Sequence, residues 1–377
     1  MKLRALVAIV ASLALLAAAC GSDDDTDTAA SGSDSSSASG SASASASASA
    51  SASASEPAED DAMEEDDAME EDDAMEEDEG DDVAACSGNY AFESYSGDAD
   101  IPRNPENIAV FDLGMLTSFN ELGIPIDGDD GFASLGTPLP ADIEAVASIP
   151  QSLGTAFEPD LEALNAMEPD LIVVASRSSR LYPDLVDLDI APVVDLTSFD
   201  GPETDFFDEF ARTHRHIGEI FCVQDEVEAV IADLQGQIDT INAAAGDVGE
   251  ALVLVTTGAE VGAFGPGAFR FGQVYDTYGF TAADDSLARD ETHGEPVSYE
   301  FIAEAEPDVL FVVDRAAAVG EEGESAEAIL DNALVDATPA AENGQIFYVD
   351  SFDWYIVFNG ILGVQGVAED LSAAVAG

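Results

Sequence analysis

The sequence is poor in basic residues. Its 377 residues include 10 Lys and Arg against 79 Asp and Glu, which gives a formal net charge of −69. A nucleic-acid-binding protein needs a basic surface to displace phosphate counterions, so this composition argues against that class. It also excludes docking on an anionic membrane through a polybasic patch. No lysine follows Lys2, and residues 87–377 hold eight arginines against 56 acidic residues, so each arginine is a candidate for a specific role.

Histidine and cysteine are also scarce, with three of each. The sequence has no nucleophile elbow, no P-loop and no zinc-ligand pair. His214 and His216 are two residues apart on a predicted helix, where their side chains point about 200° apart and cannot share a metal ion. We expect both to be solvated helix residues. His293 lies in a predicted loop and carries no chemistry by itself.

The amino terminus is typical of a secreted lipoprotein. Residues 1–19 combine Lys2 and Arg4 with an apolar run and small residues before Cys20, which predicts a signal peptide and lipidation of Cys20. The alternative is ordinary signal cleavage with Cys20 incidental. Residues 20–85 contain a Ser-Ala tract and three copies of EDDAME, so they cannot bury a core and predict a disordered, extended tether.

The two other cysteines form an even pair. Cys86 and Cys222 lack the spacing of a metal site, and outside the cytoplasm such a pair can form a disulfide. The sequence does not give their distance in space, so the pairing stays open.

Beyond residue 100, apolar runs alternate with helical stretches, which is typical of parallel sheets covered by helices. The predicted strands are 108–111, 171–175, 192–196, 251–255, 309–313 and 346–349.

Two segments repeat with a constant offset of 138 residues. In each, a glutamate near a helix start (Glu162 or Glu300) precedes a Glu-Pro-Asp turn, a buried strand and an arginine (Arg177 or Arg315). Proline explains the turn, because it ends the helix and fixes φ before the strand. The repeat predicts two lobes of similar α/β build.

The segment 204–245 is helical in composition and is broken around Cys222. Its second half has apolar residues at helical spacing, so we expect a stiff helix between the lobes. The predicted organisation is an N-terminal lobe at 86–222, an interlobe helix at 223–245 and a C-terminal lobe at 246–377. Such a protein flexes only modestly.

Three arginines are predicted to share one cleft. The stretch GAFGPGAFRFG at 262–272 does not match the dinucleotide fingerprint, and we interpret it as a loop that carries Arg270 to the carboxyl edge of a sheet, where ligands bind. The repeat places Arg177 and Arg315 at the same edge of their lobes. Arginine keeps its charge and offers a planar donor fork, so the cluster predicts an anion site. The alternative for any single arginine is a local ion pair.

These residues resemble the substrate-binding lipoproteins of ABC importers for iron–siderophore complexes, in the branch for catecholates of the petrobactin type. The resemblance spans about residues 100–377 and is carried by Asn104-Pro105-Glu106, Asp112-Leu113-Gly114, Glu158-Pro159-Asp160, the Arg270 loop, His293-Gly294, Asp314-Arg315 and Trp354-Tyr355. Two departures are Ser176, where glycine is common, and IVFNGILG at 356–363, where relatives have a glycine-rich turn.

The resemblance implies two Rossmann-like lobes joined by a long helix, the class III periplasmic-binding-protein fold. It implies that Arg177, Arg270 and Arg315 neutralise a ferric complex, that Trp354 lies near it, and that His293 and Tyr355 are candidate iron ligands. It also implies that Glu162 and Glu300 contact permease subunits. We expect a monomeric extracytoplasmic protein, held to the membrane only by its lipid, with no resident cofactor and no enzymatic activity.

Three alternatives remain at this stage. A haem or cobalamin carrier on the same fold would favour a more apolar cleft. An extracytoplasmic enzyme is disfavoured, because the sequence shows no nucleophile–base pair or multi-ligand metal site. An acidic surface scaffold would bind no small molecule saturably.

Overall fold

The computed structural model describes residues 86–136, 138–197, 204–288 and 293–377. The predicted signal peptide, the tether at 20–85 and the lipidation of Cys20 lie outside the described residues. Within those ranges, no helix has both the length and the apolarity that crossing a bilayer requires.

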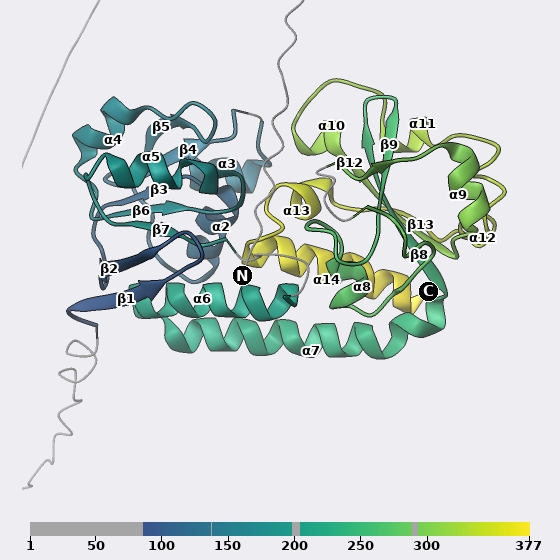
Figure 1. The fold of residues 1–377 in the computed structure, drawn as a ribbon, viewed down its shortest axis with the longest axis horizontal. Helices are drawn as coiled ribbons and strands as arrows, with labels where there is room; N and C mark the ends of the chain where they lie inside the picture. The colour runs from purple at the N-terminus through teal and green to yellow at the C-terminus, as the bar shows by residue number, and fades with distance from the viewer. Residues whose placement is uncertain (1–85, 137, 198–203, 289–292) are drawn as a thin grey trace, which may run out of the picture. The chain divides into compact units, whose positions relative to one another are not determined.

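The first lobe is built on a five-stranded parallel sheet in the order β5–β4–β3–β6–β7 (Figure 1). The strands are β3 (Ile108–Val110), β4 (Gly131–Ser134), β5 (Gln151–Thr155), β6 (Leu171–Val174) and β7 (Val193–Asp195). The helical segments are α2 (Leu113–Glu121), α3 (Ala141–Ala147), α4 (Leu161–Met167), the 3₁₀ helix η1 (Ser176–Leu181) and α5 (Tyr182–Asp187). The central strands β3 and β6 are buried along their whole length, as expected for a sheet covered on both faces. A separate hairpin joins β1 (Asn89–Glu93) and β2 (Asp98–Pro102).

The second lobe has a mixed sheet in the order β11–β9–β8–β12–β13, with β10 paired to β8. Its strands are β8 (Glu250–Thr257), β9 (Glu260–Phe264), β10 (Thr281–Ala282), β11 (Glu295–Pro296), β12 (Val309–Asp314) and β13 (Ile346–Tyr348). The strands β8, β12 and β13 are parallel, whereas β9 and β11 run antiparallel to their neighbours. The helices are α8 (Gln273–Asp276), α9 (Tyr299–Ala305), α10 (Arg315–Ala318), α11 (Ala326–Ile329), α12 (Pro339–Glu342), α13 (Ser351–Tyr355) and α14 (Ile361–Ala376).

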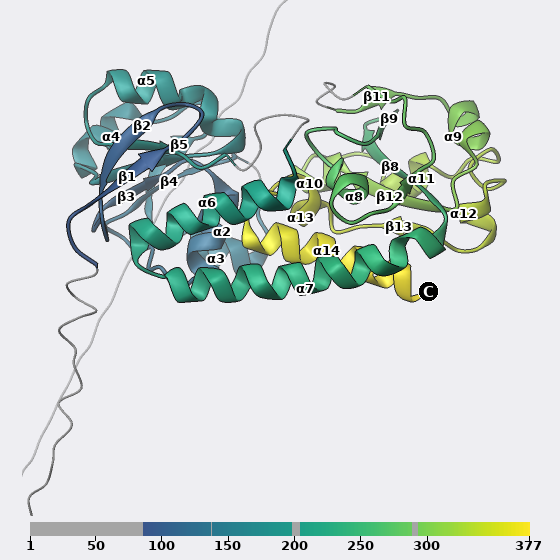
Figure 2. The ribbon, with the colours of Figure 1, turned by 60° about the horizontal axis from the view of Figure 1, so that its bottom comes forward.

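Two long helices follow the first lobe, α6 (Phe206–Phe221) and α7 (Gln224–Val248), and α7 leads directly into β8 of the second lobe. Cys222 ends α6 in a left-handed conformation, where the sequence predicts the break. Figures 1 and 2 show α7 passing both sheets, with α14 beside it. The apolar positions of α7 that face inward, from Val227 to Ala245, are buried, so the predicted long helix between the lobes is present.

The 138-residue repeat is also confirmed. Asp160 and Ser298 cap the equivalent helices α4 and α9, and Glu168 and Glu306 end them with φ of 50° and 46°. A left-handed residue terminates a helix by turning its backbone away from the helical axis. In both lobes the following buried strand then leads directly into the short helical segment that carries the arginine.

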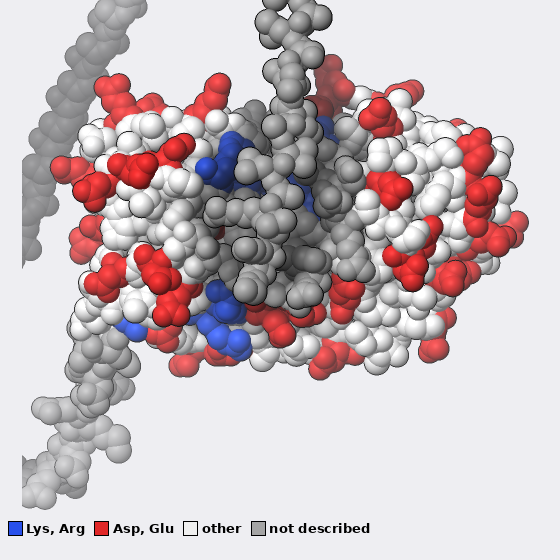
Figure 3. Space-filling view, in the orientation of Figure 1, with Lys and Arg blue, Asp and Glu red and all other residues white. Residues whose placement is uncertain are grey.

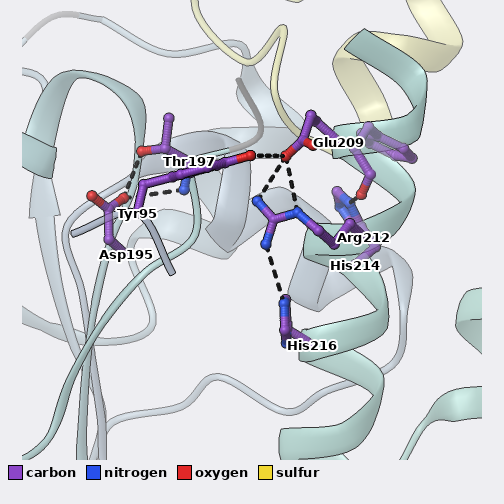
Figure 4. A network of polar contacts seen from close by, with 8 residues as sticks. Tyr95, Asp195, Thr197, Glu209, Arg212, His214 and His216 are labelled. Atoms are coloured by element: carbon purple, nitrogen blue, oxygen red, sulfur yellow. Dashed lines mark hydrogen bonds and ion pairs between the residues drawn. The ribbon is translucent and has the colours of Figure 1, made fainter. Parts of the chain in front are cut away.

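The prediction that both helical histidines are solvated was wrong for His214, whereas His216 is half-buried. His214 is 1% exposed, with its Nδ1 2.8 Å from the Phe210 carbonyl oxygen and its Nε2 3.0 Å from Ser118 Oγ. His216 Nδ1 lies 2.7 Å from Tyr90 Oη, on the hairpin. The reason is that α2 and the β1–β2 hairpin cover faces of α6 that would otherwise meet water (Figure 4 shows both histidines on α6). Burial lowers the pKa of His214 to about 4.

Cys86 and Cys222 form a disulfide, with Cα atoms 5.7 Å apart. The bond ties the start of the described chain, just before β1, to the end of α6, across 136 residues of sequence. A cross-link of that span removes much conformational freedom from the unfolded chain.

We therefore expect the double variant Cys86→Ser, Cys222→Ser to lose up to about 5 kcal/mol of unfolding free energy, the loop-entropy value for a cross-link of this span. Denaturant unfolding measures the loss, and the parent protein in reducing agent is the matched control, because it should unfold like the variant. A variant as stable as the oxidised parent would contradict the prediction.

Candidate ligand-binding site

The arginines divide into two groups. Four of the seven described arginines form ion pairs with glutamates; they are Arg103, Arg212, Arg215 and Arg315. Figure 4 shows one such local arrangement, in which Arg212 binds Glu209 and also contacts His216. Arg177, Arg180 and Arg270 have no ion pair within the part of the chain that the structure describes. In so acidic a chain, an arginine without a carboxylate indicates a site for another anion.

The three predicted cleft arginines converge on Tyr355. The guanidinium carbon of Arg177 lies 5.3 Å from the centre of the Tyr355 ring, and that of Arg270 lies 4.6 Å from it. Arg315 is close enough to Tyr355 for that side chain to act on the arginine's pKa. Figure 3 shows few blue side chains, toward the centre and the lower left of the view, whereas red side chains are spread over both lobes. The structure thus brings together residues that are up to 178 positions apart.

Arg270 is the arginine whose donors are least satisfied. It is 7% exposed, yet its Nε and Nη1 have no hydrogen-bond partner among the described residues. A buried donor without an acceptor is costly, and such a group in a native structure calls for an explanation. The ring faces of Tyr355 and Phe358 lie beside the guanidinium, so the described residues give these two in-plane N–H groups no acceptor.

Arg177 already has acceptors, and they belong to the other lobe. Its Nη1 and Nη2 donate to the carbonyl oxygens of Ile356 and Tyr355, at 3.1 and 2.5 Å. These carbonyls end helix α13, where a cation is favoured by the helix dipole. Burial, and then the nearby charge of Arg270, lower the pKa of Arg177 to about 10, so it keeps its charge at neutral pH and connects the two lobes.

Arg315 starts α10, directly after β12. Its Nη1 lies 3.1 Å from Glu321 Oε2, and its Nε has no partner within the described ranges. Burial works to lower its pKa, but hydrogen bonds and charge interactions with Tyr355 and Glu321 outweigh burial and raise the pKa above its ordinary value.

His293 faces the same cluster. Partial burial and then the positive charges of Arg315 and Arg270 lower its pKa, so the imidazole is neutral at pH 7. Its backbone is held close to strand β9, because β11 pairs with β9 and the His293 carbonyl oxygen occupies the place of a side chain at Gly262. This glycine therefore positions the histidine.

The interpretation of 262–272 as a loop was wrong over its first three residues. Residues 262–264 belong to β9, which turns back on β8 through Gly258, where φ is +58°. Arg270 therefore enters the site from a loop after an antiparallel strand rather than from the carboxyl end of a parallel one. Val261 and Phe264, residue types that are common in strands, are the signal that could have indicated the strand.

Trp354 does not face the cleft. It is fully buried, with its ring packed against Phe271 and Phe311 and its Nε1 donating to Asp370 Oδ2 at 2.8 Å. It therefore supports α13 behind Tyr355 and has no surface for direct contact with a ligand.

Sequence reasoning missed the contact that joins the lobes behind the arginines. Asn359 Nδ2 donates to the buried Asp112 Oδ1 at 3.1 Å, and Gly360 lies against the Gly114 carbonyl. Burial raises the pKa of Asp112. The partners are 247 residues apart, so no local pattern indicated the pair; the departure IVFNGILG was the only hint.

Glu162 and Glu300 occupy equivalent exposed positions, each in the first turn of its helix. The structure places one on each lobe, at α4 and α9. No group of three or more His, Cys, Asp or Glu side chains is arranged to hold a metal ion within the described ranges.

A family model described as "Periplasmic binding protein" matches residues 128–351. Among characterised proteins, the petrobactin-binding protein YclQ of Bacillus subtilis is 32% identical over 265 residues, which cover 69% of this chain and 80% of YclQ. The ferric-anguibactin-binding protein FatB of Vibrio anguillarum is 28% identical over 73% of this chain and 84% of FatB.

The fold is also similar to that of solved structures. The crystal structure of the periplasmic catecholate-siderophore binding protein VctP from Vibrio cholerae superposes with a TM-score of 0.68 at 28% identity. The match covers 76% of this chain and 100% of VctP.

Proposed function

Because the chain belongs to the periplasmic binding protein family, we propose that it captures a ferric siderophore of the catecholate type outside the cytoplasm and delivers it to an ABC permease. The observation that carries this proposal is the convergence of Arg177, Arg270 and Arg315 on Tyr355, with donors of Arg270 left free. The ligands named for YclQ and VctP support the siderophore class.

The chemistry of the cluster suits this ligand. Catecholate oxygens carry the negative charge of the ferric complex at its surface, where a planar guanidinium can donate two hydrogen bonds at once. Partial burial strengthens each of these contacts, because little water competes for them. A haem or cobalamin carrier would not need three cations around one tyrosine, so the charge of the site favours the siderophore.

The rest of the proposal follows from that role. The protein binds and releases its ligand unchanged, so it needs neither a resident cofactor nor a catalytic residue. We further propose that it acts as a monomer, and that the lipid on Cys20 keeps it at the outer face of the membrane, near its permease.

Replacing Arg270 by alanine should weaken binding of a ferric catecholate by about ten- to 150-fold, the loss expected for a charge-assisted contact. Arg270→Lys should recover only part of the affinity, because it restores the charge but not the fork. Arg177→Ala and Arg315→Ala should also weaken binding. Quenching of Trp354, the only tryptophan, measures affinity.

The matched control for these variants is Arg215→Ala, which removes an equal charge from an exposed ion pair on α6 and should bind normally. Unchanged affinity in all three cleft variants would contradict the anion site.

Glu162 and Glu300 are proposed to bind arginines of the two permease subunits. The double variant Glu162→Arg, Glu300→Arg should abolish uptake of the ferric complex by whole cells and leave its affinity for the purified protein unchanged. Reversal of two other exposed glutamates, Glu226 on α7 and Glu342 on α12, is the control and should not affect uptake. Normal transport by the first variant would refute the assignment.

Direct coordination of iron by His293 and Tyr355 is proposed for siderophores that supply only four donors. Octahedral Fe(III) then has two open positions, which phenolate oxygen and imidazole nitrogen can fill. Tyr355 would bind the metal through its phenolate oxygen, beside the arginine cluster. His293 is ready to bind at neutral pH, because burial and the arginine charges keep its pKa below the ordinary value of 6.5.

A tetradentate ferric bis-catecholate should therefore show a shifted charge-transfer band on binding, and the variant His293→Ala, Tyr355→Phe should lose the shift. Affinity of the parent should fall as the pH drops below the lowered pKa of His293, since protonation removes the nitrogen lone pair. A hexadentate ferric tris-catecholate is the control ligand and should show neither effect. If the variant and parent have equal spectra with the tetradentate complex, direct coordination is wrong.

A further inference from the structure

A fourth arginine, Arg180, lies on the ligand side of the first lobe. It follows Arg177 by three residues on the 3₁₀ helix η1. Because such a helix has three residues per turn, side chains at i and i+3 lie on the same face. Arg177 reaches the second lobe from that face, so Arg180 emerges on the cleft side of η1.

The side chain of Arg180 crosses the edge of the sheet where ligands bind. Its helix follows β6, but its Nη2 donates to the carbonyl oxygen of Ala156, just beyond β5, at 2.9 Å. Strands β4 and β3 lie between β5 and β6 in the sheet. The arginine therefore extends over the carboxyl ends of these strands, the region in which open α/β sheets bind their ligands.

Phe157 holds the guanidinium in place. The Arg180 Cζ lies 4.7 Å from the centre of the Phe157 ring, and the ring is itself 52% exposed. The aromatic ring covers one face of the guanidinium and Ala156 takes one N–H, which leaves other in-plane N–H groups on an open edge. A guanidinium fixed in this way loses little freedom on binding, and its edge matches the two oxygens of a carboxylate.

The charge of Arg180 is not used within the protein. It is exposed and has no ion pair in the described part of the chain, although acidic residues outnumber arginines sevenfold beyond residue 86. The exposed Arg215, by contrast, is paired with Glu228 at 2.6 Å. Two of the three unpaired arginines, Arg177 and Arg270, belong to the cluster around Tyr355, and Arg180 is the third.

We propose that Arg180 and Phe157 form a subsite for a carboxylate of the bound siderophore that is not coordinated to iron. The subsite rests on the proposed function and makes it more specific. The cluster around Tyr355 neutralises the charge at the metal centre, whereas Arg180 selects ferric complexes by a second, peripheral anion.

The test uses two ferric bis-catecholates that are identical except for the linker, which carries a free carboxylate in one and a neutral carboxamide in the other. The parent should prefer the carboxylate ligand by about tenfold, the effect of one charge-assisted contact. Arg180→Gln should abolish the preference and leave affinity for the carboxamide ligand within about threefold. Arg180→Lys should keep part of the preference, and Phe157→Leu should reduce it.

Arg215→Gln is the control for net charge, because it removes the same charge away from the cleft and should keep the full preference. The subsite is refuted if the parent binds both ligands equally, or if Arg180→Gln weakens both ligands to the same extent. If the parent binds neither complex, the proposed function itself fails, and the subsite fails with it; binding of both without preference refutes the subsite alone.

Discussion

Repulsion between positive charges in a partly buried space is the constraint on which this site depends. Arg177, Arg270 and Arg315 surround one tyrosine, and burial first, then the charges of Arg270 and Arg315, act to lower the pKa of Arg177. The protein offsets this repulsion only in part, with the buried carboxyl group of Asp112, the Glu321 carboxylate paired with Arg315, two backbone carbonyls and the faces of aromatic rings. What remains unbalanced is positive, so an anion that enters the site relieves repulsion as well as making hydrogen bonds.

The arginines come from both lobes, Arg177 from the first and Arg315 from the second. The cluster therefore needs contacts that hold the two lobes together. Arg177 crosses from η1 to the end of α13, and Asn359 meets Asp112 behind it. Helix α14 leaves the second lobe and begins against α2 of the first, where Ser118 Oγ accepts the Ile361 N–H at 3.0 Å. That hydroxyl also lies 3.0 Å from His214 on α6. Three helices therefore meet at one serine, which favours small changes between the lobes over a wide hinge motion.

The sequence could predict what is local or repeated. Buried strands, the Glu-Pro-Asp turns and the arginines that follow them have near-neighbour signals, and the 138-residue offset related the two lobes without any structure. Contacts between distant segments had no such signal. The burial of His214 depends on α2, 96 residues earlier, and the pair Asn359–Asp112 spans 247 residues. Arg180 is distinguished from a solvated arginine by its contacts with Ala156 and Phe157. Strand β9 was missed because Gly262 and the glycines after it suggested a loop, although Gly262 makes a close backbone contact with His293.

The repeat also explains how one local motif serves two surfaces. In each copy the helix begins with an exposed glutamate, Glu162 or Glu300, and the strand after it ends in an arginine, Arg177 or Arg315. The helix and the strand after it run in opposite directions. The first turn of the helix and the end of the strand therefore lie toward the same edge of the lobe. Negative charge is thereby exposed at the rim while positive charge is kept in the cleft.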